Sequence, residues 1–357
     1  MTKRSAQAGT IRERHVGLWE ARYVGADGRR HSIYGPTSRE VQANLRTALT
    51  AADHAISPPD ARLTVGGWLD AWLTAAAPHL RPATSESYRN VSRLYLRPAI
   101  GGVPLSKLTP DHVGRLLAEL TARGDLSPTT VRYSYAVLRI ALGRALKAGK
   151  VLRNVATLID PPAKARPELR PLSADEVRTF LASVEGDRLA PLYVVAIGTG
   201  LRQGELLGLR WADLDLDRGM LTVRHQLGRD GLLAEPKTAR ARRTLALGGA
   251  VRSALREQRR RQAADRLAAG GHWQDQGYVF TTPTGGPLDH ANVLHRFQAA
   301  IGRAGLPHQR FHDLRHAAAT LLLERGEDLA VISKMLGHSN LGTTADVYAH
   351  LTLGHRR

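Results

Sequence analysis

The chain has 357 residues, with 51 Lys and Arg against 32 Asp and Glu, a formal net charge of +19 and no cysteine. The absence of cysteine excludes a disulfide framework, a thiolate metal site and a cysteine nucleophile. The sequence offers neither the ~18 consecutive apolar residues of a membrane helix nor an apolar signal core at the N-terminus. We therefore expect a cytoplasmic protein with no membrane partner.

The positive charge favours a polyanionic partner, because each cation placed on a phosphate releases condensed counterions. Arginine supplies most of this charge. Its planar guanidinium binds phosphate oxygens in pairs, whereas lysine acts as a point charge. Nucleic acid is the first candidate partner.

Proline-bearing stretches divide the chain into three expected domains. These are a small domain over 1–61, a second over 62–160 and a third over 172–357, with a linker over 161–171. The middle stretch is the most basic for its size.

In 1–61, alternating residues predict a strand over Leu18–Val24, a turn at 26–28 and a returning strand over His31–Tyr34. A helix over about 38–52 is expected to follow. The result is a small strand–strand–helix module, with a third strand as an option.

The middle domain is predicted to be a four-helix unit. Its helices begin near Val65, Thr84, Pro110 and Pro128. Trp68 and Trp72 lie at helical spacing, and we assign them to the core in preference to a base-stacking platform. Capping is the favoured role of the Ser127 hydroxyl, with phosphate binding as the alternative.

The last domain opens with a capping box that starts at Ser173. A helix ending at Gly200 and another at about 204–209 precede three short strands, predicted at Met220–His225, Leu232–Glu235 and Arg243–Leu247. Further helices are predicted at about 249–269, 289–304, 312–325, 328–336 and 343–351. The fold class is mainly α with small antiparallel β-sheets.

Three motifs resemble metal or nucleotide sites but are incomplete. The glycine-spaced run from Gly337 lacks the lysine of a phosphate loop. The alternating aspartates from Asp213 lack the glycine and glutamate of a calcium loop. The histidines at 308, 312 and 316 lack the glutamate of a zincin motif. We therefore expect no metal and no cofactor.

A set of phosphate-binding residue types remains. Arg202 lies in the segment TGLRQGEL, and Lys237 follows Pro236 in a predicted strand turn. His312 and Arg315 share a face at a helix N-terminus, where unpaired N–H groups and the helix dipole favour an anion. His338 follows the next predicted helix and the glycine that ends it, and Tyr348 lies in the predicted helix after that.

This order of residues resembles the tyrosine recombinase or phage integrase family, whose functional positions match Arg202, Lys237, His312, Arg315, His338 and Tyr348. The match covers the whole last domain and implies an α+β catalytic domain. The middle domain resembles the helical core-binding domain of the family. The 1–61 stretch resembles the small three-stranded domain by which some integrases hold arm-type DNA sites.

The resemblance implies that Tyr348 attacks the scissile phosphate, stays joined to the 3′ phosphate and frees a 5′-hydroxyl, without metal or ATP. Arg202 and Arg315 are expected to stabilise the charge on the phosphoryl oxygens. Lys237 is the candidate general acid for the leaving oxygen.

Two histidines and a glutamate complete the expected site. A histidine has an ordinary pKa of ~6.5, so His312 is assigned to accept the tyrosine proton. His338 is expected to donate a hydrogen bond to a non-bridging oxygen. Glu205 is expected to support the site by orienting its neighbours.

The expected function is site-specific recombination that integrates or excises a phage or mobile element in a bacterial host cell. The implied partners are double-stranded DNA with attachment sites, three further copies of the chain in a synaptic tetramer, and an accessory DNA-bending protein or excisionase. The short stretch after Tyr348 puts docking of the tail on a neighbouring protomer in doubt. Two alternatives stay open: a type IB topoisomerase-like enzyme and a catalytically inert DNA-binding protein.

Overall fold

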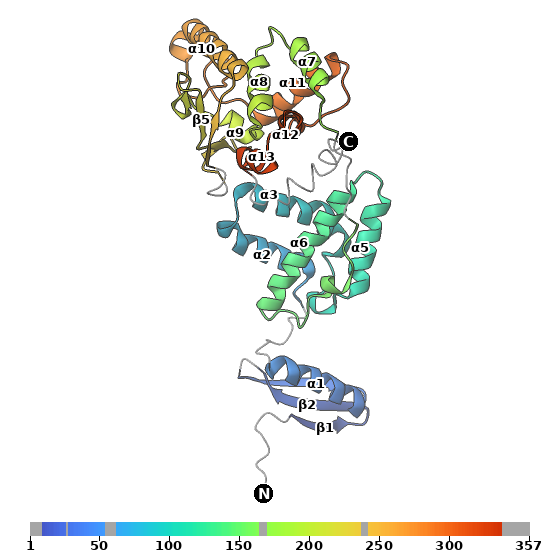
Figure 1. The fold of residues 1–357 in the computed structure, drawn as a ribbon. Coiled ribbons are helices and arrows are strands. Elements are labelled where there is room, and N and C mark those ends of the chain that lie inside the picture. The colour runs from blue at the N-terminus through green and yellow to red at the C-terminus, as the bar shows by residue number, and fades with distance from the viewer. Residues whose placement is uncertain (1–8, 26–27, 54–61, 164–169, 237–241, 338–357) are drawn as a thin grey trace. The chain divides into compact units, whose positions relative to one another are not determined.

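A computed structural model describes residues 9–25, 28–53, 62–163, 170–236 and 242–337 (Figure 1). The chain divides into two compact units, Met1–Pro167 and Glu168–Arg357. Three predicted site residues, Lys237, His338 and Tyr348, lie outside the described residues. So do the helix expected at 343–351 and most of the expected linker.

The first stretch is an antiparallel sheet of β1 (Thr10–His15), β2 (Leu18–Val24) and β3 (Arg30–Gly35), with β2 in the centre. The optional third strand is therefore present, as β1. Helix α1 (Ser38–Asp53) lies along one face of this sheet (Figure 1). It buries the apolar side chains that alternate along β2, because successive residues of a strand point to opposite faces.

The middle stretch is helical, as predicted. Its helices are α2 (Val65–Ala76), α3 (Pro82–Val91), α4 (Arg97–Ile100), α5 (Pro110–Ala122) and α6 (Pro128–Lys147), with a π-helical turn over Ser92–Leu96 and short 3₁₀ turns at Ala77–His79, Leu105–Lys107 and Val155–Leu158. Trp72 is buried in the core, and Trp68 packs against it and donates to the Ala141 carbonyl. Ser127 accepts a hydrogen bond from the Thr130 N–H, which confirms the cap.

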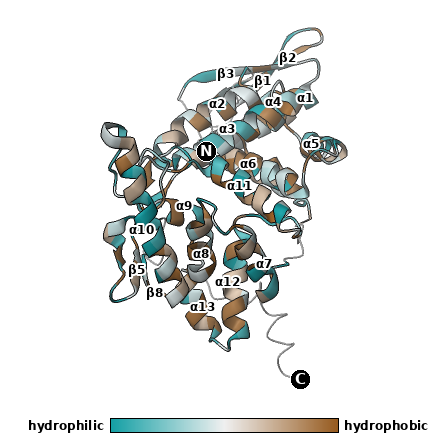
Figure 2. Ribbon diagram, turned by 90° about the horizontal axis from the view of Figure 1, so that it is seen from above, coloured by the Kyte–Doolittle hydropathy of each residue, from teal (hydrophilic) through white to brown (hydrophobic). Residues whose placement is uncertain are grey.

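The last unit surrounds helix α8 (Ala190–Thr199), which is buried on nearly all sides. Helices α10 (Gly249–Ala269) and α12 (Asp313–Glu324) pack against it. The other helices are α7 (Ala174–Ser183), α9 (Gln203–Leu207), α11 (His290–Arg303) and α13 (Leu329–Leu336), with 3₁₀ turns at Trp211–Asp213 and Gly270–His272. Figure 2 shows teal, hydrophilic residues along much of α10 and brown, apolar ones on α13.

The three predicted strands are present but do not form one sheet. β4 (Leu214–Asp215), β5 (Met220–Val223) and β8 (Arg243–Ala246) make one antiparallel sheet, whereas β6 (Gln226–Leu227) and β7 (Leu233–Ala234) make another. The first strand is shorter than predicted, because Arg224 and His225 approach the buried Asp213 carboxylate at 3.6 and 3.7 Å instead of continuing the strand. The fold class, mainly α with small antiparallel sheets, is confirmed.

Candidate active site

Arg202 lies where α8 gives way to α9. Helix α8 ends at Gly200, whose φ of 62° is in the left-handed region that glycine adopts without steric cost. Arg202 is then the N-cap residue of α9, with extended backbone. Its backbone N–H donates to Glu205 Oε2 at 3.0 Å, and its Nη1 donates to Glu205 Oε1 at 2.8 Å. The backbone and the side chain of Arg202 are thus fixed by one carboxylate.

Glu205 is 3% exposed and binds a second arginine. Arg243, at the start of β8, donates from Nη2 to Oε2 at 2.8 Å and from Nη1 to Oε1 at 3.3 Å. Burial raises the pKa of Glu205, but the hydrogen bond and charge of Arg243, aided by Arg202, outweigh it and hold the pKa below its ordinary value. The carboxylate is therefore ionised at neutral pH.

Arg315 projects from the first turn of α12 and is 2% exposed. Its Nη1 donates to the Gly200 carbonyl at 2.7 Å, and its Nη2 donates to the Leu336 carbonyl. Both contacts cross between elements far apart in sequence. They place Arg315 between the end of α8 and the end of α13.

The C-terminus of α13 receives three arginines on three successive carbonyls. Arg243 Nε donates to Met335 O at 2.6 Å, Arg315 to Leu336 O, and Arg202 Nη2 to Gly337 O at 3.3 Å. The last carbonyls of a helix have no partner within the helix and carry the negative end of its dipole. This helix end therefore gathers cations, and Gly337, in the left-handed conformation, leads directly to His338.

His312 stands at the N-terminal end of α12, beside Arg315. His312 is exposed to solvent. Desolvation by the surrounding protein, followed by the fields of His316, Arg315 and Arg202, lowers the pKa of His312 to about 4, against an opposing effect of Asp313. The His312 and His316 rings meet edge to face at 5.3 Å between centroids. Burial also lowers the pKa of His316.

The structure thus brings together four of the seven predicted site residues: Arg202, Glu205, His312 and Arg315. Lys237 lies outside the described residues, but Glu235 and Arg242, on either side of its segment, form an ion pair at 2.7 Å. His338 and Tyr348 also lie outside the described residues, and their roles stay predictions.

The sequence analysis did not assign Arg243 to the site. Its guanidinium contacts Glu205 and the Met335 carbonyl, so it lies between α9 and the end of α13. A signal was present in the sequence, since Arg243 shares the strand face of Leu245, which is buried. An arginine on the inward face of a strand requires a buried acceptor.

Across 9–25, 28–53, 62–163, 170–236 and 242–337, no group of three or more histidine, aspartate and glutamate side chains is arranged to hold a metal ion. Asp213, the first of the alternating aspartates, accepts from the Arg210 N–H and is near Arg224. In the same described ranges, no helix is long and apolar enough to cross a membrane.

The chain is similar to known proteins along most of its length. The model of the phage integrase family matches residues 170–355, and that of the phage integrase N-terminal SAM-like domain matches 64–121. A tyrosine recombinase XerC-like protein of Caldanaerobacter subterraneus subsp. tengcongensis is 31% identical over 345 residues, covering 90% of this chain and 88% of its own. An integrase of Streptomyces ambofaciens is 30% identical, covering 88% of this chain and 83% of its own.

Solved structures show the same fold. The Tn1549 transposon integrase in complex with transposon right end DNA superimposes with a TM-score of 0.69 at 20% identity, over 82% of this chain and 99% of that chain. A lambda integrase tetramer bound to a Holliday junction gives 0.62 at 20% identity, over 92% and 95%. The family model, the relatives and the fold agree: the chain belongs to the phage integrase family and is a tyrosine-type site-specific recombinase.

Proposed function

We propose that this recombinase integrates and excises a phage or mobile element by cleaving and rejoining duplex DNA through a 3′-phosphotyrosyl intermediate, with Tyr348 as the nucleophile. The observation that carries the proposal is the meeting of Arg202 and Arg315 at the end of α13, next to the position of His338 in the chain. Two cations from separate elements converge there on one place, as a phosphoryl-transfer site requires.

The proposed strand cleavage needs no co-reactant. The Tyr348 oxygen forms a bond to phosphorus while the bond to the 5′ oxygen breaks, so the phosphodiester is replaced by a phosphotyrosyl ester of similar energy. The tyrosine proton passes to His312, and Lys237 gives a proton to the departing 5′ oxygen. Attack by the 5′-hydroxyl of another strand reverses each step. Neither ATP nor a metal ion enters the scheme.

Arg202 and Arg315 differ in solvent exposure and therefore have different roles in the reaction. The Arg202 side chain is 38% exposed, so its guanidinium can contact a phosphate oxygen directly. Arg315 is buried, and its charge acts over a short distance in a medium of low dielectric constant. Because both are fixed before DNA arrives, they stabilise the transition state with little reorganisation.

His312 enters the reaction as a neutral imidazole. With a pKa of about 4 it carries no proton at neutral pH, so it is able to accept the tyrosine proton. A bound phosphate adds a negative charge beside it and raises that pKa, which makes His312 a stronger base in the complex. His338 donates to a non-bridging oxygen in this scheme.

The N-terminal sheet supports the assignment of 1–61 to arm-type DNA sites. Its face opposite α1 carries Arg12, Arg14 and Arg22 around Glu20, which is buried by these partners. The Arg22 and Arg12 hydrogen bonds lower the pKa of Glu20 to about 2. Half-exposed arginines on one face of a sheet suit the phosphates of a duplex. We assign 62–160 to the core site and 172–357 to catalysis, with a linker over 161–171.

The partners follow from the proposed reaction. Two duplexes with attachment sites exchange four strands, so four copies of the chain are needed, and the lambda integrase neighbour is a tetramer on a Holliday junction. We further propose that an accessory DNA-bending protein or excisionase determines whether the recombinase integrates or excises the element. The place of action is the cytoplasm of the bacterial host.

The test is covalent trapping. Wild type and Tyr348→Phe are expressed in a bacterial host that carries DNA of the source element, adducts are trapped with detergent, and the DNA ends are sequenced. Adducts from wild type alone, joined at a 3′ phosphate at one or two sites, support the proposal. Adducts from both proteins remove Tyr348 from the mechanism. Relaxation of a plasmid without sequence preference indicates the topoisomerase-like alternative, and DNA binding without adducts indicates the inert one.

A further inference from the structure

Arg243 is buried in the catalytic unit without being one of the residues that the family resemblance assigned. Its side chain is 6% exposed, at the first position of β8. The backbone of β8 pairs with β5, with Arg243 opposite Val223, so the position of its Cα is set by the sheet. A guanidinium so deeply buried is costly unless its N–H groups are paired.

The Arg243 guanidinium joins two parts of the site. Nη1 and Nη2 donate to the two oxygens of Glu205 at 3.3 and 2.8 Å. Nε donates to the carbonyl of Met335, in the last turn of α13, at 2.6 Å. One planar group therefore fixes the distance between α9 and the end of α13.

The three segments that meet at Arg243 are those that carry the proposed catalytic groups. Glu205 holds the backbone and the side chain of Arg202. Two residues after Met335 the chain reaches Gly337, whose carbonyl accepts from Arg202 and which precedes His338. Arg243 itself begins β8, and Lys237 precedes this strand in the chain.

We propose that Arg243 is a positioning residue for strand cleavage, which orients Arg202 through Glu205 and fixes the end of α13 from which His338 follows. The inference rests on the proposed function. Without Arg243, both oxygens of Glu205 are left to Arg202, which is then drawn toward the carboxylate and away from the phosphate. The Met335 carbonyl loses its partner at the same time. A misplacement of ~1 Å is enough to lower a rate about 10²-fold.

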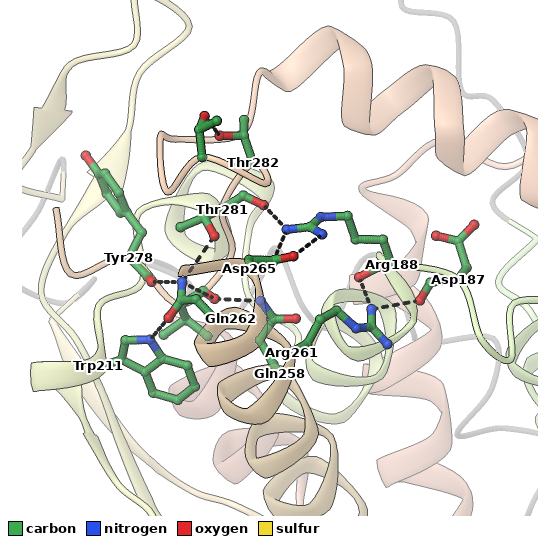
Figure 3. Close-up of polar contacts among 12 residues, drawn as sticks. Asp187, Arg188, Trp211, Gln258, Arg261, Gln262, Asp265, Tyr278, Thr281 and Thr282 are labelled. Carbon is green, nitrogen blue, oxygen red and sulfur yellow. Dashed lines mark hydrogen bonds and ion pairs between the residues drawn. The ribbon is translucent and has the colours of Figure 1, made fainter. Parts of the chain in front are cut away.

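The variants are Arg243→Gln, which removes the charge, and Arg243→Lys, which keeps it but cannot bind both oxygens in a fork. Arg188→Gln is the matched control. Arg188 forms a similar forked pair with Asp265 on α10, at 3.1 and 2.5 Å, and also reaches the Thr281 carbonyl (Figure 3). That pair belongs to a polar network outside the proposed site, so its loss reports destabilisation alone.

The measurement is the single-turnover rate of covalent adduct formation by the full chain, at saturating protein, on the duplex mapped by the trapping experiment. The DNA dissociation constant is measured in parallel, at a temperature at which circular dichroism shows every variant folded. We expect Arg243→Gln to lower the rate about 10²-fold and Arg243→Lys to lower it less, each with a dissociation constant within about threefold of wild type. Arg188→Gln should keep the wild-type rate.

A double variant tests the route through Glu205. If Arg243 acts through that carboxylate, Glu205→Gln with Arg243→Gln should be no slower than Glu205→Gln alone. If the rate losses of the two single variants multiply in the double variant, Arg243 does not act through Glu205. If Arg243→Gln reacts as fast as Arg188→Gln, the inference as a whole is overturned. Failure of the proposed function is distinct, because wild type then forms no adduct that depends on Tyr348.

Discussion

The substitution Glu205→Gln should strongly destabilise the unit Glu168–Arg357 at neutral pH. The glutamine has the same shape but no charge, and it leaves the buried Arg243 guanidinium without its anion. Removing one partner of a buried ion pair costs about 3–5 kcal/mol. For a unit of this size, each kcal/mol lowers the Tm by ~2–4 °C, so the expected decrease in Tm is about 6–20 °C.

The pH dependence of this decrease gives a second readout. The pKa of Glu205 is lower in the folded state than its ordinary value of 4.5, so the carboxylate stabilises the fold fully above that value. The contribution is lost as the pH falls through the folded pKa, whereas glutamine does not titrate there. The Tm difference between wild type and variant should therefore shrink in acid.

Thermal unfolding of the full chain, followed by circular dichroism between about pH 7 and pH 3.5, measures both effects. Asp265→Asn serves as the control, since it breaks the Arg188 pair, whose side chains are 25% and 17% exposed, and should cost less. A Tm difference for Glu205→Gln that is no larger than for Asp265→Asn, or that stays constant from neutral to acid pH, would refute the reasoning.

Three further predictions concern the reaction and the DNA. Lys237→Ala should slow cleavage of ordinary DNA about 10²–10⁴-fold, but only slightly for a substrate whose 5′ bridging oxygen is sulfur, because a thiolate leaves without a general acid; equal losses on both substrates would count against Lys237 as the acid. Titration of His312 should not lower the second-order rate constant for cleavage between neutral pH and about pH 5, because the pKa of His312 in the free protein is about 4. A decrease in this rate constant with an apparent pKa near 6.5, absent in His312→Asn, would contradict the assignment. Arg12→Ala and Arg22→Ala should each reduce the slope of log K against log salt for arm-site DNA by about 1 and leave core-site cleavage unchanged; an unchanged slope would place the DNA elsewhere.

Much of the fold could be predicted because local signals agree with the packing. The capping box at Ser173 forms as expected, with reciprocal hydrogen bonds between Ser173 and Glu176. The two-residue strands β4 and β6 could not be predicted, since two residues carry no periodicity. The π-helical turn over Ser92–Leu96 was also missed, because one extra residue in a helix leaves the apolar pattern on either side intact.

The candidate site was predictable in its residue types but not in its connections. Sequence order indicated Arg202 and Arg315, yet nothing local shows that their guanidinium groups meet at the carbonyls of α13. Such contacts depend on how α8, α12 and α13 pack, which is tertiary information. Glu205 illustrates the same limit. Its supporting role could be expected, but the strand that carries its second partner, Arg243, indicates only that a buried acceptor is needed and not which residue supplies it.

The arrangement at the end of α13 explains how several arginines are kept close together in a protein that is already strongly basic. Like charges at short range repel, and a bound phosphate cannot compensate for them before DNA is present. In the structure, one carboxylate and three helix-terminal carbonyls supply the compensation. One carboxylate against three guanidinium groups leaves a net positive charge, held in place by acceptors that do not depart when DNA binds. Under the proposed function, the site is therefore arranged for an anionic phosphoryl group before DNA binds, and the free-energy cost of that arrangement is met during folding instead of during catalysis.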